Sequence, residues 1–308
     1  MRVRGWRRVS HGLFLRELDL PHDDEVLRDL HAWLLVLPPG AVFTHLTAAR
    51  LRGWHLPSLP EQVPVFAAVE ESANRPRRPG LVCSRLRRTT DVEWRHGLPV
   101  ERPEEILLRA ARDLGLLDLS VLVESARHLG DIDETRMAAL LDRPRPGVRA
   151  LRDAWERSTA AAESPGETLL RLFHDVIDVA TTPQVRLVDA EHRLLGVADL
   201  LVDGTGLVHE YDGAVHRDAA QHRIDLRRER GWAGSRFVRR GFTLDDLLNH
   251  PVTTMHEIDR ALDRAHVPRR IERWRRLVTE SLYSEPGRRR VQNRWNRAMG
   301  VSEWSRTA

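Results

Sequence analysis

The feature that most limits how this chain can fold is the stretch 196–216, which reads GVADLLVDGTGLVHEYDGAVH. Two apolar runs flank a turn rich in Asp and Gly, and this pattern is typical of a tight β-hairpin. If Gly204 and Thr205 form the loop, residue 202 pairs with 207, and residue 199 pairs with 210. The sequence therefore predicts a half-buried hairpin with acidic residues where apolar ones would be expected.

Strand alternation places the acids of this hairpin together. Val208, Glu210 and Asp212 share one face, whereas His209 and Tyr211 lie on the other. Asp199 would lie opposite Glu210, so three carboxylates would share one small patch. Like charges directly opposite each other destabilise a strand pair, and partial burial adds to that cost.

Clustered carboxylate oxygens suit a hard cation such as Mg²⁺ or Mn²⁺. We therefore interpret Asp199, Glu210 and Asp212 as metal ligands and catalytic residues. Two alternatives stay open at this point. The acids could lie on an exposed face and meet water, or the pairing could slip by one residue and separate them.

Residues after the hairpin add further candidates. His216 lies four positions beyond Asp212 and could act as a base or a proton shuttle, or as ordinary polar surface. Arg217 and Arg228 are candidates for contacts with substrate phosphates. Asp225 and Arg228 are three residues apart, so they would share a helix face, either near the site or as a surface ion pair.

The surrounding segment, residues 163–265, predicts one α/β unit. Ser164, Pro165 and Glu167 are typical of a helix start, and Glu167 is either a fourth acid of the site or only a capping residue. Strands are expected at 184–189, 194–202, 206–212 and 235–240, with a helix at about 216–231. Thr243 and Asp246 predict the cap of a final helix.

The preceding segment, residues 1–150, predicts a separate mixed α+β unit. A helix is expected within 43–57, short strands within 63–98, and helical structure over 103–142. The sequence RPRPG at 143–147 is a break, and we place the domain boundary between it and Ser164.

The last segment, residues 266–308, is rich in Arg and carries Trp274, Trp295 and Trp304. Such a tail could bind phosphates and stack on bases. The alternative is an amphipathic helix with a solvated basic face.

Composition limits the class of protein. The 49 basic residues are all Arg, and the formal net charge is only +4, which is weak support for nucleic-acid binding. Cys83 is the only cysteine, so no intramolecular disulfide can form, as expected in a reducing cytosol. No segment has the length and apolarity of a membrane span or a signal peptide, and we expect a soluble cytoplasmic protein without membrane contact.

The motifs ESPGETLLRLF, GVADLLVDGTGLVHEYDGAVHRD, QHRIDLRRERGW and SRFVRRGFTLDDL resemble the Vsr-like branch of the PD-(D/E)XK nuclease superfamily over about 163–262. The resemblance implies a restriction-endonuclease-like αβββαβ core that cleaves DNA. It matches Asp199 and Glu210 to metal-binding acids and His216 to the histidine of that branch. Asp212 stands where many relatives have a lysine. The chain has no lysine, and arginine stays protonated, so Asp212 or His216 would have to accept the proton of the attacking water.

A second resemblance covers about 40–130. FTHLTAARLRGWHLP, RRPGLVCSRL and HGLPVERPEEILLRAARDLG are similar to the AbiEi antitoxin family of abortive-infection systems. This resemblance implies a partial winged-helix domain that holds DNA or a partner such as a toxin or another defence protein.

Two functions follow as hypotheses. The first is a Mg²⁺- or Mn²⁺-dependent DNA endonuclease in repair or phage defence. The second is a DNA-binding regulator or antitoxin whose nuclease fold is inactive, and it is motivated by the missing lysine and the regulator-like first half. Nothing in the sequence separates DNA from RNA as the substrate.

Overall fold

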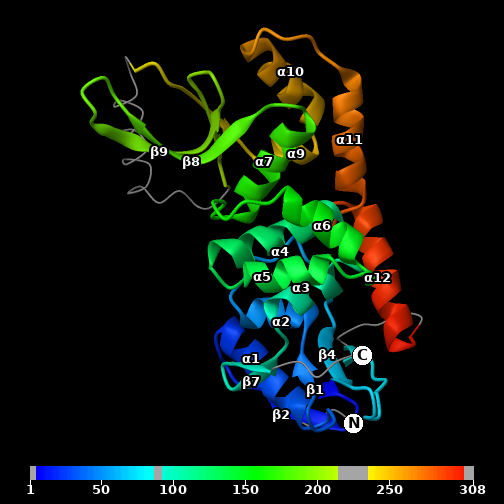
Figure 1. The fold of residues 1–308 in the computed structure, drawn as a ribbon. Helices are drawn as coiled ribbons and strands as arrows, with labels where there is room; N and C mark the ends of the chain where they lie inside the picture. The colour runs from blue at the N-terminus through cyan, green and yellow to red at the C-terminus, as the bar shows by residue number, and fades with distance from the viewer. Residues whose placement is uncertain (1–4, 87–91, 214–234, 302–308) are drawn as a thin grey trace.

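The computed structural model describes residues 5–86, 92–213 and 235–301, and it is a mixed α/β protein, as predicted. Figure 1 shows a β-rich region at each end of the molecule and a layer of helices between them. Helices α11 (Pro268–Thr279) and α12 (Glu285–Met299) run along one side of these layers. Within the described residues, no helix combines the length and apolarity needed to cross a bilayer.

The N-terminal half contains a hairpin, two helices and a sheet. The hairpin is β1 (Trp6–Ser10) and β2 (Leu13–Arg16), and the helices are α1 (His22–Leu34) and α2 (His45–Leu51). The sheet has the order β5-β4-β3-β7-β6, with β5 (Leu81–Leu86), β4 (Val65–Glu70), β3 (Val42–Phe43), β7 (Leu98–Val100) and β6 (Glu93–Arg95). The helix within 43–57 and the strands within 63–98 are confirmed, whereas the first hairpin was not predicted.

The expected helical stretch 103–142 is three helices. They are α3 (Pro103–Ala110), α4 (Leu116–His128) and α5 (Glu134–Leu141), and α6 (Val148–Glu156) follows the predicted break. Gly115 and Asp133 are the N-cap residues of α4 and α5, which explains why the continuous apolar periodicity does not give one long helix.

The C-terminal half has the predicted element order in its described residues. It runs α7 (Pro165–Val176), β8 (Thr181–Val188), β9 (Leu194–Val202), β10 (Leu207–Tyr211), β11 (Val238–Phe242), α9 (Leu244–Leu248) and α10 (Pro251–Ala261). The sheet order is β11-β10-β9-β8, with β8, β9 and β10 antiparallel and β10 parallel to β11. A parallel pair needs a long crossover connection, which here contains residues 214–234. The predicted helix at 216–231 lies in that connection, outside the described residues.

Both predicted helix starts are confirmed. The Ser164 hydroxyl accepts a hydrogen bond from the backbone N–H of Glu167 at 3.2 Å, and Pro165 occupies the first turn of α7. Thr243 and Asp246 form a capping box at the start of α9. These local signals fix where α7 and α9 begin, and both helix starts lie next to strands of the C-terminal sheet.

The apolar core forms two main clusters, and α4 contributes to both of them. Leu119 and Leu122 belong to the N-terminal cluster, whereas Leu117 and Val121 belong to the C-terminal one. The segment expected as an Arg/Trp-rich tail also belongs to these cores. Trp274 is 0% exposed in the C-terminal cluster and Trp295 is 1% exposed in the N-terminal cluster.

The expectation that Trp274 and Trp295 could stack on bases is therefore wrong, because both rings are buried. Each indole N–H has an internal partner. Trp274 donates to the Leu247 carbonyl at 2.7 Å, and Trp295 donates to Asp113 Oδ2 at 3.1 Å. Trp304 lies outside the described residues.

Candidate functional site

The β9–β10 hairpin has the predicted register. Val208 lies opposite Leu201, and His209 lies opposite Leu200, which is the pairing expected from a loop at Gly204 and Thr205. Gly204 has a φ of +73°, a left-handed conformation that glycine adopts without strain. A slip by one residue is thus excluded for the paired part of the hairpin.

The backbone pairing of β9 with β10 ends at Leu200 and His209. Beyond this pair, the side chain of Asp199 contacts the backbone of β10. Asp199 Oδ2 accepts a hydrogen bond from the backbone N–H of Tyr211 at 2.9 Å. Burial raises the pKa of the Asp199 carboxyl to about 6, the Tyr211 N–H opposes that rise, and the negative charges of Glu167 and Glu210 add to it. The charges of acids on α7 and β10 therefore act on Asp199 of β9.

Glu167 is both a capping residue and a neighbour of this site. Its carboxylate accepts hydrogen bonds from Ser164 Oγ at 2.8 Å, from the Glu163 N–H at 3.0 Å and from Gln184 Nε2 at 3.0 Å. The capping role confirms the local interpretation, and the charge of Glu167 also raises the pKa of Asp199. The capping role of Glu167 is therefore confirmed, and its membership of the functional site stays a prediction.

Glu210 and Asp212 lie beside Arg239, which was not predicted as a site residue. Arg239 forms an ion pair with Glu210 and lies 3.8 Å from Asp212 Oδ1. The side chains of Glu210 and Asp212 are 12% and 32% exposed, so neither acid lies on a fully solvated face. Asp212 also lies directly over Gly241, where an added Cβ would overlap its carboxylate.

The parallel pairing of β10 with β11 brings Arg239 to this face. Val208 pairs with Arg239 and Glu210 pairs with Gly241, so these side chains point to the same side of the sheet. The run RFVRRGF predicts a strand that contains arginines. The sequence does not show which residues of β10 this strand pairs with, because the two strands are far apart in the chain.

The opposite face of β10 packs on α7. The Tyr211 ring lies against Gly166, and His209 is fully buried beside His174. His174 Nδ1 donates to the Leu170 carbonyl at 2.8 Å, so its Nε2 accepts from His209 Nδ1 at 2.7 Å. His209 Nε2 is then buried without a partner among the described residues. Burial lowers the pKa of His174 to about 4 and that of His209 to about 3, so both rings are neutral at pH 7.

Four predicted site residues lie outside the described part of the chain. They are His216, Arg217, Asp225 and Arg228. The acids Glu167, Asp199, Glu210 and Asp212 are the predicted site residues that the structure describes, and all of them lie around the hairpin and the start of α7.

The donor chemistry of this cluster fits a hard divalent cation, since it consists of carboxylate oxygens on adjacent elements. In this structure Arg239 forms an ion pair with Glu210, so an arginine balances the charge of that acid. Among the described residues, no three or more His, Cys, Asp or Glu side chains are already arranged to hold a metal ion. A cation at Asp199 and Glu210 would therefore either share Glu210 with Arg239 or displace Arg239 from it.

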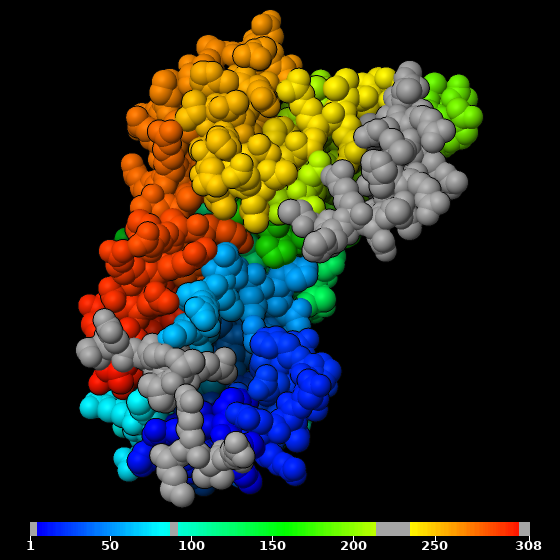
Figure 2. Space-filling view, turned by 180° about the vertical axis from the view of Figure 1, so that it is seen from behind, coloured from blue at the N-terminus to red at the C-terminus, as the bar shows by residue number. Residues whose placement is uncertain are grey.

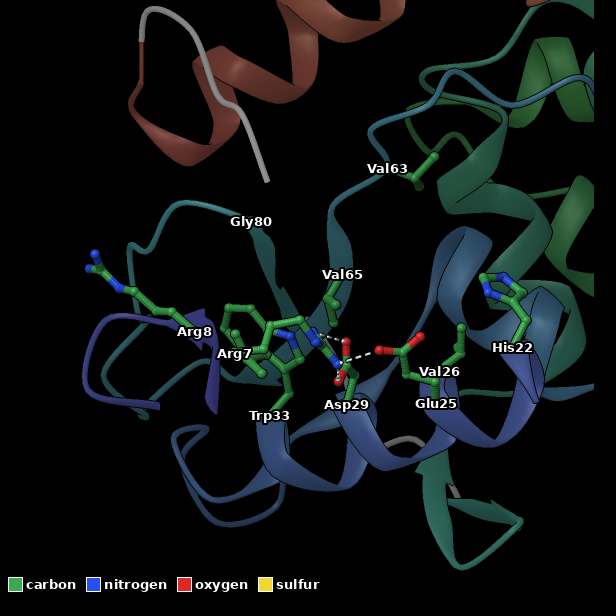
Figure 3. Close-up of a pocket in the computed structure, with 11 residues that line it drawn as sticks. Arg7, Arg8, His22, Glu25, Val26, Asp29, Trp33, Val63, Val65 and Gly80 are labelled. Atoms are coloured by element: carbon green, nitrogen blue, oxygen red, sulfur yellow. Dashed lines mark hydrogen bonds and ion pairs between the residues drawn. The ribbon is translucent and has the colours of Figure 1, made fainter. Parts of the chain in front are cut away.

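A pocket of about 260 Å³ at the other end of the molecule is a different kind of site (Figure 3). It lies between β1 and α1, and Arg7 crosses it to reach Asp29 at 2.6 Å and Glu25 at 3.0 Å. Arg7 therefore already pairs with both acids inside the N-terminal half. The pocket therefore adds nothing to the acids of the hairpin.

Comparisons of the chain with protein-family profiles, with curated proteins and with solved structures found no match. The function has to follow from the chemistry of the site itself.

Proposed function

We propose that the C-terminal half hydrolyses phosphodiester bonds of DNA with the help of Mg²⁺ or Mn²⁺. The observation that carries this proposal is the half-buried Asp199, whose pKa is raised to about 6 by burial and by the charges of Glu167 and Glu210. Keeping acids close together in a partly buried site costs free energy, because each disfavours ionisation of the others. A bound cation would offset this repulsion.

Asp199 and Glu210 are the residues that would hold the cation, with Asp212 completing the set. A divalent cation there would supply Lewis-acid polarisation of a phosphodiester. The Asp212 side chain is 32% exposed, against 12% for Glu210, so Asp212 can meet a water molecule and accept its proton. His216 remains a second candidate for this proton-accepting role and lies outside the described residues.

Arg239 has a role in the same proposal. If a cation on Glu210 displaces the guanidinium from that carboxylate, Arg239 needs another oxyanion. A substrate phosphate on the same face of the sheet offers one, because guanidinium binds phosphate oxygens through paired hydrogen bonds. Substrate and cation would thus replace the Arg239–Glu210 pair together.

Two further observations support DNA cleavage as the reaction. The described elements run helix, three antiparallel strands, and a fourth strand parallel to the third, which agrees with the order expected from the Vsr-like resemblance. Asp199 and Glu210, the acids that the resemblance matches to metal ligands, lie near each other in the β9–β10 hairpin. RNA stays the competing substrate, and its cleavage has to be assayed alongside that of DNA.

The test is nicking of supercoiled plasmid by the full chain with Mg²⁺ or Mn²⁺, with a single-stranded RNA as the second substrate. Asp199→Asn and Glu210→Gln should each reduce the nicking rate at least about a hundredfold, the scale on which catalytic charge and proton transfer act. Asp203→Asn is the matched control, because Asp203 is an exposed acid at the tip of the same hairpin. The Asp203 carboxylate accepts a hydrogen bond from Thr182 Oγ1 at 2.8 Å, and an asparagine side-chain oxygen can accept the same bond. Undiminished nicking by Asp199→Asn would count against this site, and cleavage of RNA instead of plasmid would reassign the substrate.

The second candidate function is a DNA-binding regulator, similar to an antitoxin, with an inactive nuclease fold. The Arg239–Glu210 ion pair favours it, because the pair neutralises a proposed ligand without any metal. In this case the wild-type protein binds DNA equally well in EDTA, its affinity falls steeply with salt, and no metal ion induces nicking. Tight metal-independent binding of a toxin or other defence protein would point the same way.

A further inference from the structure

A pocket of about 410 Å³ in the N-terminal half is lined by arginines from separate elements. Arg75 comes from the loop after β4, Arg85 from the edge strand β5, Arg109 from α3, and Arg112 from the segment after α3. Figure 2 shows this region (cyan) next to the end of α12 (red), whose Ala298 closes one side of the pocket. Glu71 is the only acid among the described residues that line it.

Arg109 forms the buried wall of this arginine pocket. It is 8% exposed, and its Nε and Nη2 donate to the Glu101 carboxylate at 2.6 and 2.8 Å. Its Nη1 donates to Ser84 Oγ at 2.9 Å, and Ser84 also lines the pocket. Glu101 therefore neutralises Arg109 from behind and holds its guanidinium in place.

Arg85 and Arg112 are oriented by backbone groups. Arg85 Nη1 donates to the carbonyls of Glu71 and Ala73, and Arg112 Nε donates to the carbonyl of Pro146 at 3.2 Å. The carbonyl contacts orient the Arg85 guanidinium without cancelling its charge. Arg75 is exposed and forms no ion pair with any acid in the described part of the chain.

Cys83 shows how close these charges lie. Its thiol is buried in the pocket wall, and burial raises its pKa to about 11, while the charges of Arg75, Arg85 and Arg109 act in the opposite direction. The guanidiniums of three elements therefore lie within electrostatic reach of a single thiol. Grouping cations in this way costs free energy unless an anion lies between them.

We propose that this arginine pocket binds the phosphate group of a phosphorylated ligand. Guanidinium groups bind phosphate oxygens through several charge-assisted hydrogen bonds. The pocket has room for a phosphate and part of the molecule that carries it. This site goes beyond the proposed function, since it lies in the other half of the chain and contains none of the acids of the hairpin.

The test is calorimetric titration of pyrophosphate into the full chain at constant ionic strength. Arg75→Gln should weaken binding about tenfold, the usual effect of losing one charge-assisted hydrogen bond. Arg77→Gln is the matched control, because Arg77 is exposed in the same loop and is not among the lining residues. Both changes are at exposed positions, so unchanged thermal unfolding will show that both variants are folded.

Wild type and Arg77→Gln should bind pyrophosphate with the same affinity. No saturable binding, or equal weakening by both substitutions, would overturn the proposal.

A short DNA duplex distinguishes the sources of the phosphate. If the duplex displaces pyrophosphate, and its own affinity falls in Arg75→Gln but not in Arg77→Gln, the phosphate belongs to a nucleic-acid backbone. If pyrophosphate binds and the duplex does not displace it, the ligand is a small phosphorylated molecule. Either result supports a phosphate site in this pocket.

Discussion

At the scale of single residues, Asp199 departs most from what its position in a strand would favour. It lies in the middle of an apolar run, yet its carboxylate accepts a backbone hydrogen bond and lies near two other acids. The pKa of Asp199 in the folded protein, about 6, is above its ordinary value of 3.8. The folded chain therefore binds more protons than the unfolded chain between these values, and its stability falls as the pH rises through this window.

This difference in pKa gives a prediction for the metal-free protein. Asp199→Asn should increase the free energy of unfolding by on the order of 1–2 kcal/mol at about pH 7, a value reduced from the full linkage because the carboxyl is only partly buried. The gain should shrink to a small fraction of this value at about pH 3, where the aspartate is mostly protonated in both states. Urea unfolding in EDTA at both pH values checks this, and a gain that does not depend on pH would show that ionisation of Asp199 is not its cause.

At the scale of elements, the start of α7 and the hairpin β9–β10 were predictable because their signals are local. The capping residues of α7 lie within four positions of one another, and the hairpin register depends on its own turn. Arg239 was not predictable, because its place beside Glu210 depends on the parallel pairing of β10 and β11. The burial of Trp274 and Trp295 was missed for the same reason, since each packs on elements far away in the sequence.

The contact between α7 and β10 gives a second prediction. Gly→Ala within a helix is normally stabilising by roughly 0.5–1 kcal/mol. At Gly166, however, an added Cβ would overlap the Tyr211 ring, so Gly166→Ala should destabilise the protein by roughly 1–3 kcal/mol.

A double-mutant cycle checks this contact. In a Tyr211→Ala background the same Gly166→Ala change should lose most of its cost, because the overlapping ring is absent. Urea unfolding of the four proteins measures the coupling, and additive effects would show that the two residues do not constrain each other.

At the scale of the whole molecule, α11 and α12 connect the two halves. Trp274 of α11 belongs to the C-terminal core, and Trp295 of α12 belongs to the N-terminal core. The turn between these helices is held by Asp118 at the start of α4, which accepts the Leu282 N–H at 3.0 Å. Helices α11 and α12 thus join the half that contains the arginine pocket to the half that contains the hairpin acids, and Figure 1 shows these two helices running along both halves.

The central claim is that the hairpin acids bind a divalent cation, and calorimetric titration of Mn²⁺ into the full chain tests it most directly. Wild type and Asp203→Asn should show saturable binding with the same affinity. The double variant Asp199→Asn/Glu210→Gln should show none, because both proposed ligands lose their charge. Equal Mn²⁺ binding by the double variant, or no binding by the wild type, would contradict the claim and favour the regulator in which Arg239 alone neutralises Glu210.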